Sequence, residues 1–226
     1  MPQESTPGTR YRLIASGLVP WCLRGLGKSA MPLTLSQSVV PTDEPLNLDE
    51  IKRHLRVTFT DDDLVIFSML QTARDHLERV TRRQFLTATW VYALDTFPTS
   101  DKAMIRLPRP PLQSVSSIAY QDSDNATQVL TLNTDYGVDI LSEPGRIYLL
   151  PAKSWPSTYD VPNAVIITYI AGWDAPGKVP ASLRGLLALF VGHLYENREA
   201  ASAEKVLHEI PLGFQMLLAS NKMVEV

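Results

Sequence analysis

The sequence predicts an α+β protein in which N-terminal and C-terminal helices form a helical core, with an antiparallel β domain inserted between them. Apolar residues recur every three or four positions over 61–82 and over 183–194, as on amphipathic helices. Between residues 86 and 172 the period changes to two, and turn residues separate short runs. The predicted parts are a flexible leader and linker over 1–42, N-terminal helices over 43–85, the β domain over 86–172, C-terminal helices over 173–218 and a tail over 219–226.

Composition narrows the class of protein. The 226 residues are 45% hydrophobic and 20% charged, with a formal net charge of -3. This balance argues against a protein that wraps nucleic acid with a broad basic face, although DNA could still pass through it. The single cysteine, Cys22, cannot form an internal disulfide. No apolar run reaches the roughly 18 residues that a membrane helix needs, so we expect no membrane partner.

The first thirty residues differ from the rest. They hold four basic residues and one acid, Glu4. Such a leader has the composition of a targeting peptide, but Pro20 interrupts its short apolar stretch. We favour the alternative that Met31 is the true start and that the leader is an upstream extension.

Two N-terminal helices are expected. Asn47 can cap a short helix, and Thr60 with Asp63 has the spacing of a capping box before a long helix over 61–82. Acids four residues from arginines predict ion pairs along the long helix. Its expected apolar positions are Leu64, Phe67, Leu70, Ala73, Leu77 and Val80.

The last long helix is expected to begin with Pro180 at its first position. Leucines, Phe190 and Val191 form one apolar stripe, and Gly185, Ala188 and Gly192 form a ridge of small residues. A helix this apolar must be covered on most faces. Either the β domain or a neighbouring subunit can cover it, and the ridge is our candidate for subunit packing. A short final helix over 211–218 should follow.

No pattern in the sequence indicates catalysis, a metal or a cofactor. Asp61, Asp62 and Asp63 lie at a helix start, where acids complement the helix dipole. His193 and Glu196 match only half of a helical zinc motif, because Asn197 stands where a second histidine is needed. We therefore expect a protein that is not an enzyme.

Four arginines are candidates for facing DNA in a lumen. Arg82 and Arg83 follow the long helix, and Arg106 and Arg109 lie in the β region. Interleaved acids make a solvated, salt-bridged face the expected state of the helical arginines. The neighbouring Pro108–Pro111 segment is expected at a strand edge or turn rather than as a polyproline ligand.

Several segments, in this order, resemble the phage head–tail connector (adaptor or head-completion) family, in a longer subgroup with an enlarged β insertion. They are ARDHLERVTRRQF (73–85), TWVYALDTFP (89–98), IRLPRPPLQSVSSIAY (105–120), SWP (154–156), VIITYIAGW (165–173), VPASLRGLLALFVGHLYENRE (179–199) and IPLGFQMLL (210–218). The resemblance covers residues 43–218 and has no counterpart for the leader.

The resemblance implies a subunit of a ring, dodecameric in the assembled particle, that docks under the portal protein. DNA would pass through the ring without sequence-specific binding, and a stopper or tail-completion protein would attach to the opposite face. The implied location is the virion neck, with assembly in the host cytoplasm. A DNA-binding packaging protein with a helix-turn-helix remains an alternative, and a virion-associated hydrolase a more distant one.

The C-terminal tail is a candidate portal-docking segment. Its residues alternate in a way that suits a strand added to an exposed sheet edge, and the resemblance points the same way. The competing interpretation is a frayed terminus without function. The docking candidates are Asn221, Lys222, Met223, Val224, Glu225 and Val226.

Overall fold

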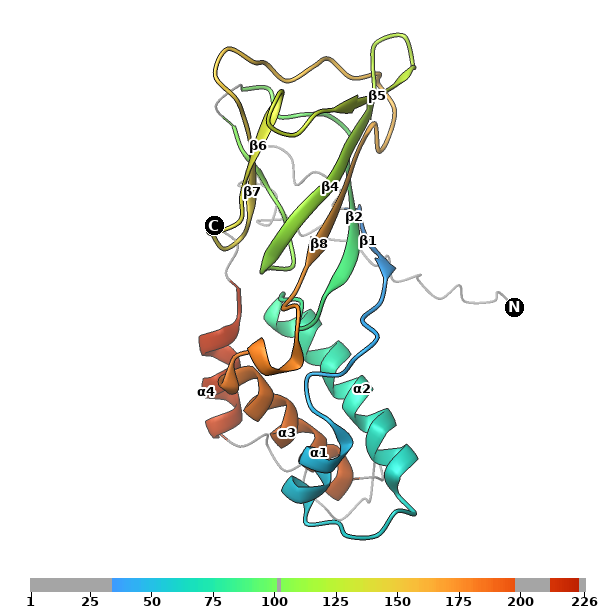
Figure 1. Ribbon diagram of the computed structural model, residues 1–226, viewed down its shortest axis with the longest axis vertical. Coiled ribbons are helices and arrows are strands. Elements are labelled where there is room, and N and C mark those ends of the chain that lie inside the picture. The colour runs from blue at the N-terminus through green and yellow to red at the C-terminus, as the bar shows by residue number, and fades with distance from the viewer. Residues whose placement is uncertain (1–33, 101–102, 198–211, 224–226) are drawn as a thin grey trace, which may run out of the picture. The chain divides into compact units, whose positions relative to one another are not determined.

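The computed structural model describes residues 34–100, 103–197 and 212–223. The chain divides into Met1–Met31 and Pro32–Val226, and the described residues all belong to the second unit. After β1, two helices are followed by the remaining strands and then by two further helices, in an α+β fold as the sequence predicts (Figure 1). In chain order the elements are β1 (Thr34–Val39), α1 (Leu48–Leu55), α2 (Asp63–Thr81), β2 (Ala88–Leu94), β3 (Ile105–Arg106), β4 (Leu112–Gln121), β5 (Thr127–Leu130), β6 (Tyr136–Asp139), β7 (Arg146–Leu149), β8 (Val165–Ala171), a 3₁₀ turn (Pro176–Lys178), α3 (Ala181–Glu196) and α4 (Leu212–Asn221).

The β strands form two antiparallel sheets. The larger has the order β1-β2-β8-β4-β5 and the smaller has the order β3-β7-β6. Buried and exposed residues alternate along β8, as the period of two predicts. One apolar core lies within this part, with Ile118, Ile147 and Ile167 fully buried.

Strand β1 corrects the predicted flexible linker over 1–42. Thr34 pairs with Ala93 and Gln37 with Trp90, so this segment extends the larger sheet. Its Leu35 packs on the β core, whereas Ser36 and Ser38 are exposed. Serines on the outer face gave the segment the composition of a linker, which hid the strand. Residues 1–33, and with them the leader, lie outside the described residues.

The helices form a second core. Ile66, Leu70, Ala73 and Leu77 of α2 are buried, together with Leu183, Leu186, Leu187 and Val191 of α3. Helices α2 and α3 pack on each other, as predicted, and His76 stacks on Phe190 with ring centroids 5.1 Å apart. The predicted stripe on α2 was wrong in part, because Leu64 and Phe67 are exposed and Ile66 takes the buried place.

Two helix starts differ from prediction. Asn47 does cap α1, in a capping box with Glu50. No capping box forms at α2, where Asp62 is the N-cap and its side chain accepts from the Tyr195 hydroxyl instead. Pro180 lies one position earlier than expected, at the N-cap of α3. Tertiary contacts thus outcompete local capping at α2.

Candidate interaction surfaces and the junction between the two cores

The described residues hold no cluster of three histidine, cysteine, aspartate or glutamate side chains placed for a metal ion. Two of the aspartates at the start of α2 are bound to side chains of the protein. Asp63 pairs with Lys52 at 2.6 Å, and Asp62 accepts from the Tyr195 hydroxyl at 2.7 Å. His193 lies beside Asn197 rather than a second ligand. No helix in the described part of the chain is long and apolar enough to cross a membrane.

The most elaborate polar arrangement lies where the helical core meets the larger sheet. The carboxylate of Glu78 is buried, and one of its oxygens accepts from the Gln84 side chain and from the Phe85 amide, both at 2.9 Å. The Gln84 carbonyl oxygen accepts from the Trp90 indole at 3.1 Å. Burial raises the pKa of Glu78 to about 7, and the amide of Phe85 and the charges of Arg74 and Arg109 only partly oppose it.

Arg109 closes this junction from the β side. Its guanidinium donates to the Glu78 backbone oxygen at 2.6 Å and lies over the Trp90 ring, 5.2 Å from the centroid. The backbone amide of Gln84 donates to the backbone oxygen of Pro110 at 3.0 Å. The end of α2, the start of β2 and the loop before β4 are therefore fastened together. Sequence reasoning missed this junction, because its members are far apart in the chain and look like surface residues.

The four arginines proposed to face a lumen divide into two pairs. Arg109 is held inside the junction, and Arg83 donates to the Asn221 oxygen and pairs with Glu143 at 2.8 Å. These two arginines therefore have partners within the subunit, whereas Arg82 and Arg106 are exposed. That any of the four faces a lumen stays a prediction.

The small-residue ridge on α3 is not a single surface. Gly192 faces α1, where a Cβ atom would lie 3.7 Å from His54, and Ala188 packs on the helical core. Both therefore have contacts within the chain, and whether they also contact a neighbouring subunit stays a prediction. Gly185 alone is exposed, with nothing within 4 Å of a Cβ atom placed there.

The start of the predicted tail is fixed to the body of the protein. Helix α4 extends to Asn221, three residues beyond the predicted end at Leu218, and the Asn221 side chain accepts from Ser182 at 2.9 Å. The Met223 amide donates to the Thr81 oxygen at 2.9 Å. Val224, Glu225 and Val226 lie outside the described residues.

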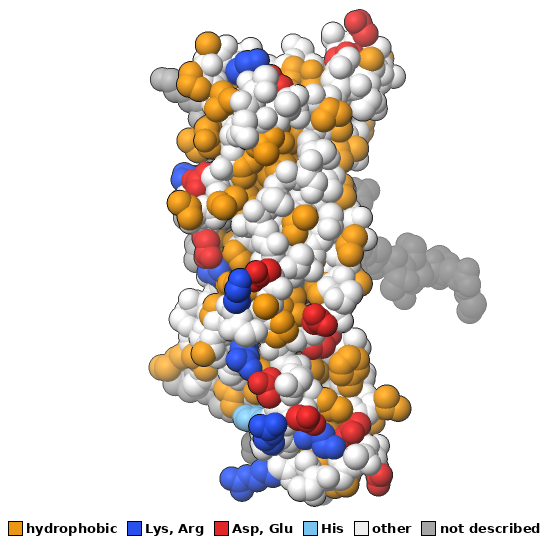
Figure 2. Space-filling model, in the orientation of Figure 1, with side chains coloured by type: hydrophobic (Ala, Val, Ile, Leu, Met, Phe, Trp, Pro, Cys, Tyr) orange, Lys and Arg blue, Asp and Glu red, His pale blue; other side chains and the backbone are white. Residues whose placement is uncertain are grey.

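Exposed apolar side chains occur in several places among the described residues. Some line a hollow of about 470 Å³, formed by Met104, Val138, Ile140, Leu141, Tyr148 and the ion pair of Asp139 with Arg146. Others lie on α2, α3 and α4. Figure 2 shows that charged side chains on this face of the molecule lie mainly over the helical part.

Residues 45–134 match the family described as Phage gp6-like head-tail connector protein. This segment, which is less than half of the chain, is similar to that head–tail connector family. The match begins just before α1 and includes the whole junction around Glu78, and it confirms the resemblance inferred from the sequence.

Solved structures extend the likeness beyond the connector segment. A chain in the neck of an empty GTA particle, computed with C6 symmetry, has a TM-score of 0.67 at 20% identity, covering 85% of this chain and 97% of that one. A chain in the virion of a native gene transfer agent (GTA) particle has a TM-score of 0.68 at 19% identity, covering 85% and 96%. The neck of a native GTA particle, computed with C12 symmetry, gives 0.63 at 20% identity, covering 84% and 97%. These likenesses show the fold that this chain shares with those particle chains. No curated protein matches the chain significantly.

Proposed function

We propose that the protein is a structural head–tail connector in the neck of a tailed phage or a related particle, without catalytic activity. The connector-family match over residues 45–134 carries this proposal. The fold supports it, because it extends over almost the full length of chains from particle necks.

In this proposal twelve subunits form a ring under the portal, DNA passes through its lumen, and a stopper or tail-completion protein binds the opposite face. The twelvefold symmetry used for one related neck supports this number. Arg82, Arg83, Arg106 and Arg109 are the lumen candidates, and Arg82 and Arg106 are the two whose side chains are exposed. A net charge of -3 suits a conduit that must release DNA. The subunit would assemble in the host cytoplasm and remain in the virion neck.

The proposal is tested by mixing the purified full chain with the portal protein of its own phage or prophage and imaging the mixture by cryo-electron microscopy. We expect a ring of connector subunits on one end of the portal. A connector chain that remains monomeric and leaves the portal bare would overturn the proposal. Tight, sequence-dependent retention of duplex DNA by the monomer would instead favour the packaging-protein alternative.

The leader is a separate proposal. We infer that Met31 is the natural start. Mass spectrometry of the protein taken from particles should then find Met31 or Pro32 at the N-terminus, and recovery of Met1 or Pro2 would refute it.

A further inference from the structure

The helical core leaves two apolar faces uncovered. On α2, Leu64 is 86% exposed and Phe67 is 41% exposed. We name these two residues the α2 face. On the other helices, Leu189 of α3 is 45% exposed and Met216 of α4 is 65% exposed, with the exposed Gly185 one turn before Leu189. We name these three residues the α3–α4 face. Single exposed apolar residues are ordinary on a protein surface, whereas several on one pair of helices suit an interaction surface.

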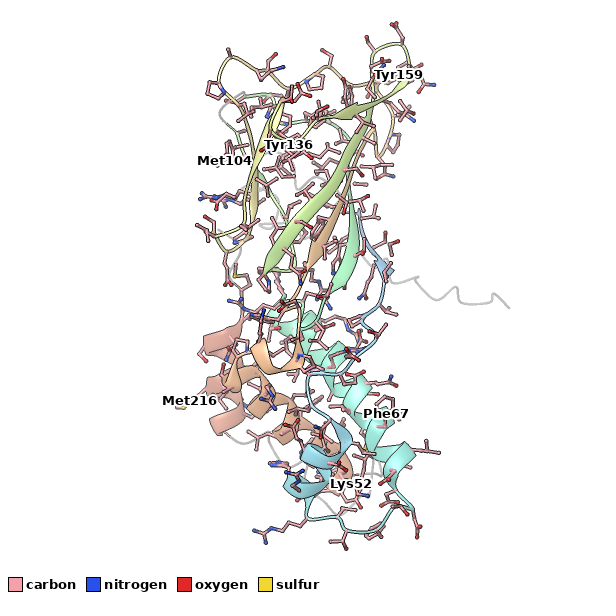
Figure 3. The ribbon with its side chains drawn as sticks, in the orientation of Figure 1. Lys52, Phe67, Met104, Tyr136, Tyr159 and Met216 are labelled. Atoms are coloured by element: carbon pink, nitrogen blue, oxygen red, sulfur yellow. The ribbon has the colours of Figure 1, made fainter. Side chains whose placement is uncertain are left out.

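The two faces lie on opposite sides of the same core. Figure 3 shows Phe67 and Met216 pointing away from the helices in opposite directions, at nearly the same level along the molecule. Between them lie the buried residues through which α2 and α3 pack together. A single side chain inserted by a neighbour therefore could not reach both faces.

The two faces also differ in shape. Leu64 and Phe67 project from α2, whereas a Cβ atom placed at Gly185 would meet nothing within 4 Å. Gly185 has no side chain to hold a neighbouring subunit away from the helix beside Leu189. None of the five residues carries a charge, so burying both faces desolvates no ion.

A closed ring of more than two copies has one requirement that a two-fold dimer lacks. Each subunit must present two different faces that fit each other, and the ring closes only if the rotation relating neighbours does so without a rise. Two unlike apolar faces at one level on opposite sides of a rigid core meet this requirement. A foreign partner would need only one of them.

We propose that the α2 face of one subunit packs against the α3–α4 face of the next copy of the chain. Leu64 and Phe67 of one copy then lie over Gly185, Leu189 and Met216 of its neighbour. This inference rests on the proposed ring, and it specifies which surfaces build it. It also assigns a role to the apolar surface of α3 that the helices of its own chain leave open.

Cross-linking with a short bis-maleimide tests the proposal on the full chain carrying Cys22→Ser, which removes the single cysteine. Phe67→Cys and Leu189→Cys change exposed side chains, so the fold should tolerate both. The double variant should give a ladder of dimers, trimers and larger products. A mixture of the two single variants with different tags should stop at mixed dimers, because each copy then has only one reactive face.

The matched control pairs Phe67→Cys with Val129→Cys. Val129 is 61% exposed and belongs to β5, at the edge of the larger sheet. This control should give no ladder. An equal ladder from the control pair would overturn the proposal, as would either single variant alone giving as much dimer as the mixture. The second result would indicate a two-fold contact between identical faces.

Sedimentation of the chain without cross-linker separates this inference from the proposed function. If the chain sediments as a ring and the Phe67/Leu189 pair gives no ladder, the assigned faces are wrong and the ring stands. If the chain sediments as a monomer and the pair gives no ladder, the assigned faces fail, and the portal-binding experiment above decides the proposed function separately. A ladder from a chain that sediments as a monomer supports the faces and indicates that they bind weakly in isolation.

Discussion

The backbone amide of Phe85 donates a hydrogen bond to the side-chain carboxylate of Glu78 at 2.9 Å, across the left-handed turn at Arg82 that ends α2. Phe85 is itself fully buried in the helical core, whereas Ala88, three residues later, belongs to the β core. A buried carboxylate therefore fixes the direction in which the chain leaves the helices and enters the larger sheet. This junction therefore helps to determine how the β domain is oriented relative to the helical core.

Stability should fall as pH rises through the titration of Glu78. Its pKa is raised from 4.5 to about 7, so the folded protein binds a proton that the unfolded chain has released over this range. The slope of unfolding free energy against pH is then negative between these values and flat above about 7. The raised pKa corresponds to a loss of at most roughly 3 kcal/mol across the window.

Glu78→Gln isolates this contribution, because an amide oxygen can still accept from Gln84 and Phe85. We expect the variant to lose most of the slope between pH 4.5 and 7 and to be at least as stable as the wild type at pH 8. Urea unfolding of both proteins at several pH values measures the slope and the stability at pH 8. Glu44, whose pKa is also raised by burial, leaves a residual slope in both proteins. Identical slopes would show that Glu78 does not titrate in this range.

Arg109→Lys should destabilise the protein by about 1–2 kcal/mol. Lysine keeps the charge and the side-chain length but loses the planar group that lies over Trp90 while donating to Glu78. The matched control is Arg79→Lys, at an exposed pair with Asp75, which should change stability by less than about 0.5 kcal/mol. Denaturant melts compare the two, and equal losses would contradict a special role for the guanidinium of Arg109.

Gly192 and Gly185 provide a matched pair on one helix. Gly192→Leu would force a side chain against His54 and Leu55 of α1 and should cost roughly 1–3 kcal/mol, as overpacking does. Gly185→Leu points into open space and should instead stabilise the subunit by up to about 1 kcal/mol through helix propensity. Thermal unfolding at low protein concentration measures both. The same sign for the two changes would mean that the packing of α3 differs from that described.

Local patterns predicted most of the fold, and tertiary contacts account for what they missed. The period of two found the seven strands after residue 86, and Asn47 marked the start of α1. Strand β1 was missed because its exposed face consists of serines. Leu64 and Phe67 were assigned to the core because a helical stripe shows that a face is apolar but not which partner covers it.

The site residues were less predictable for the same reason. Arg83 and Arg109 look like solvated cations in the sequence, and their partners Asn221 and Glu78 are respectively 138 and 31 positions away. No local period reveals such pairings. The tail was predicted to begin at 219 because α4 is short and uncharged, so no residue in it signals where the helix ends.

The last prediction concerns the proposed portal-docking segment and the point at which it should be cut. A stop after Ser220 would remove Asn221, which accepts from Ser182 and Arg83, and Met223, which donates to Thr81. That truncation should destabilise α4 and would confuse loss of fold with loss of docking. A stop after Met223 keeps these bonds and removes only Val224, Glu225 and Val226.

We expect the chain that ends at Met223 to keep its thermal stability and to lose co-purification with the portal. A short strand added to a sheet edge binds weakly alone but gains by avidity when a ring presents many copies. Titrating wild-type subunits into the truncated protein should therefore restore portal binding steeply rather than in proportion to their fraction. Full portal binding by the truncated chain would end the docking hypothesis. Loss of thermal stability together with binding would instead place the last three residues in the fold of the subunit.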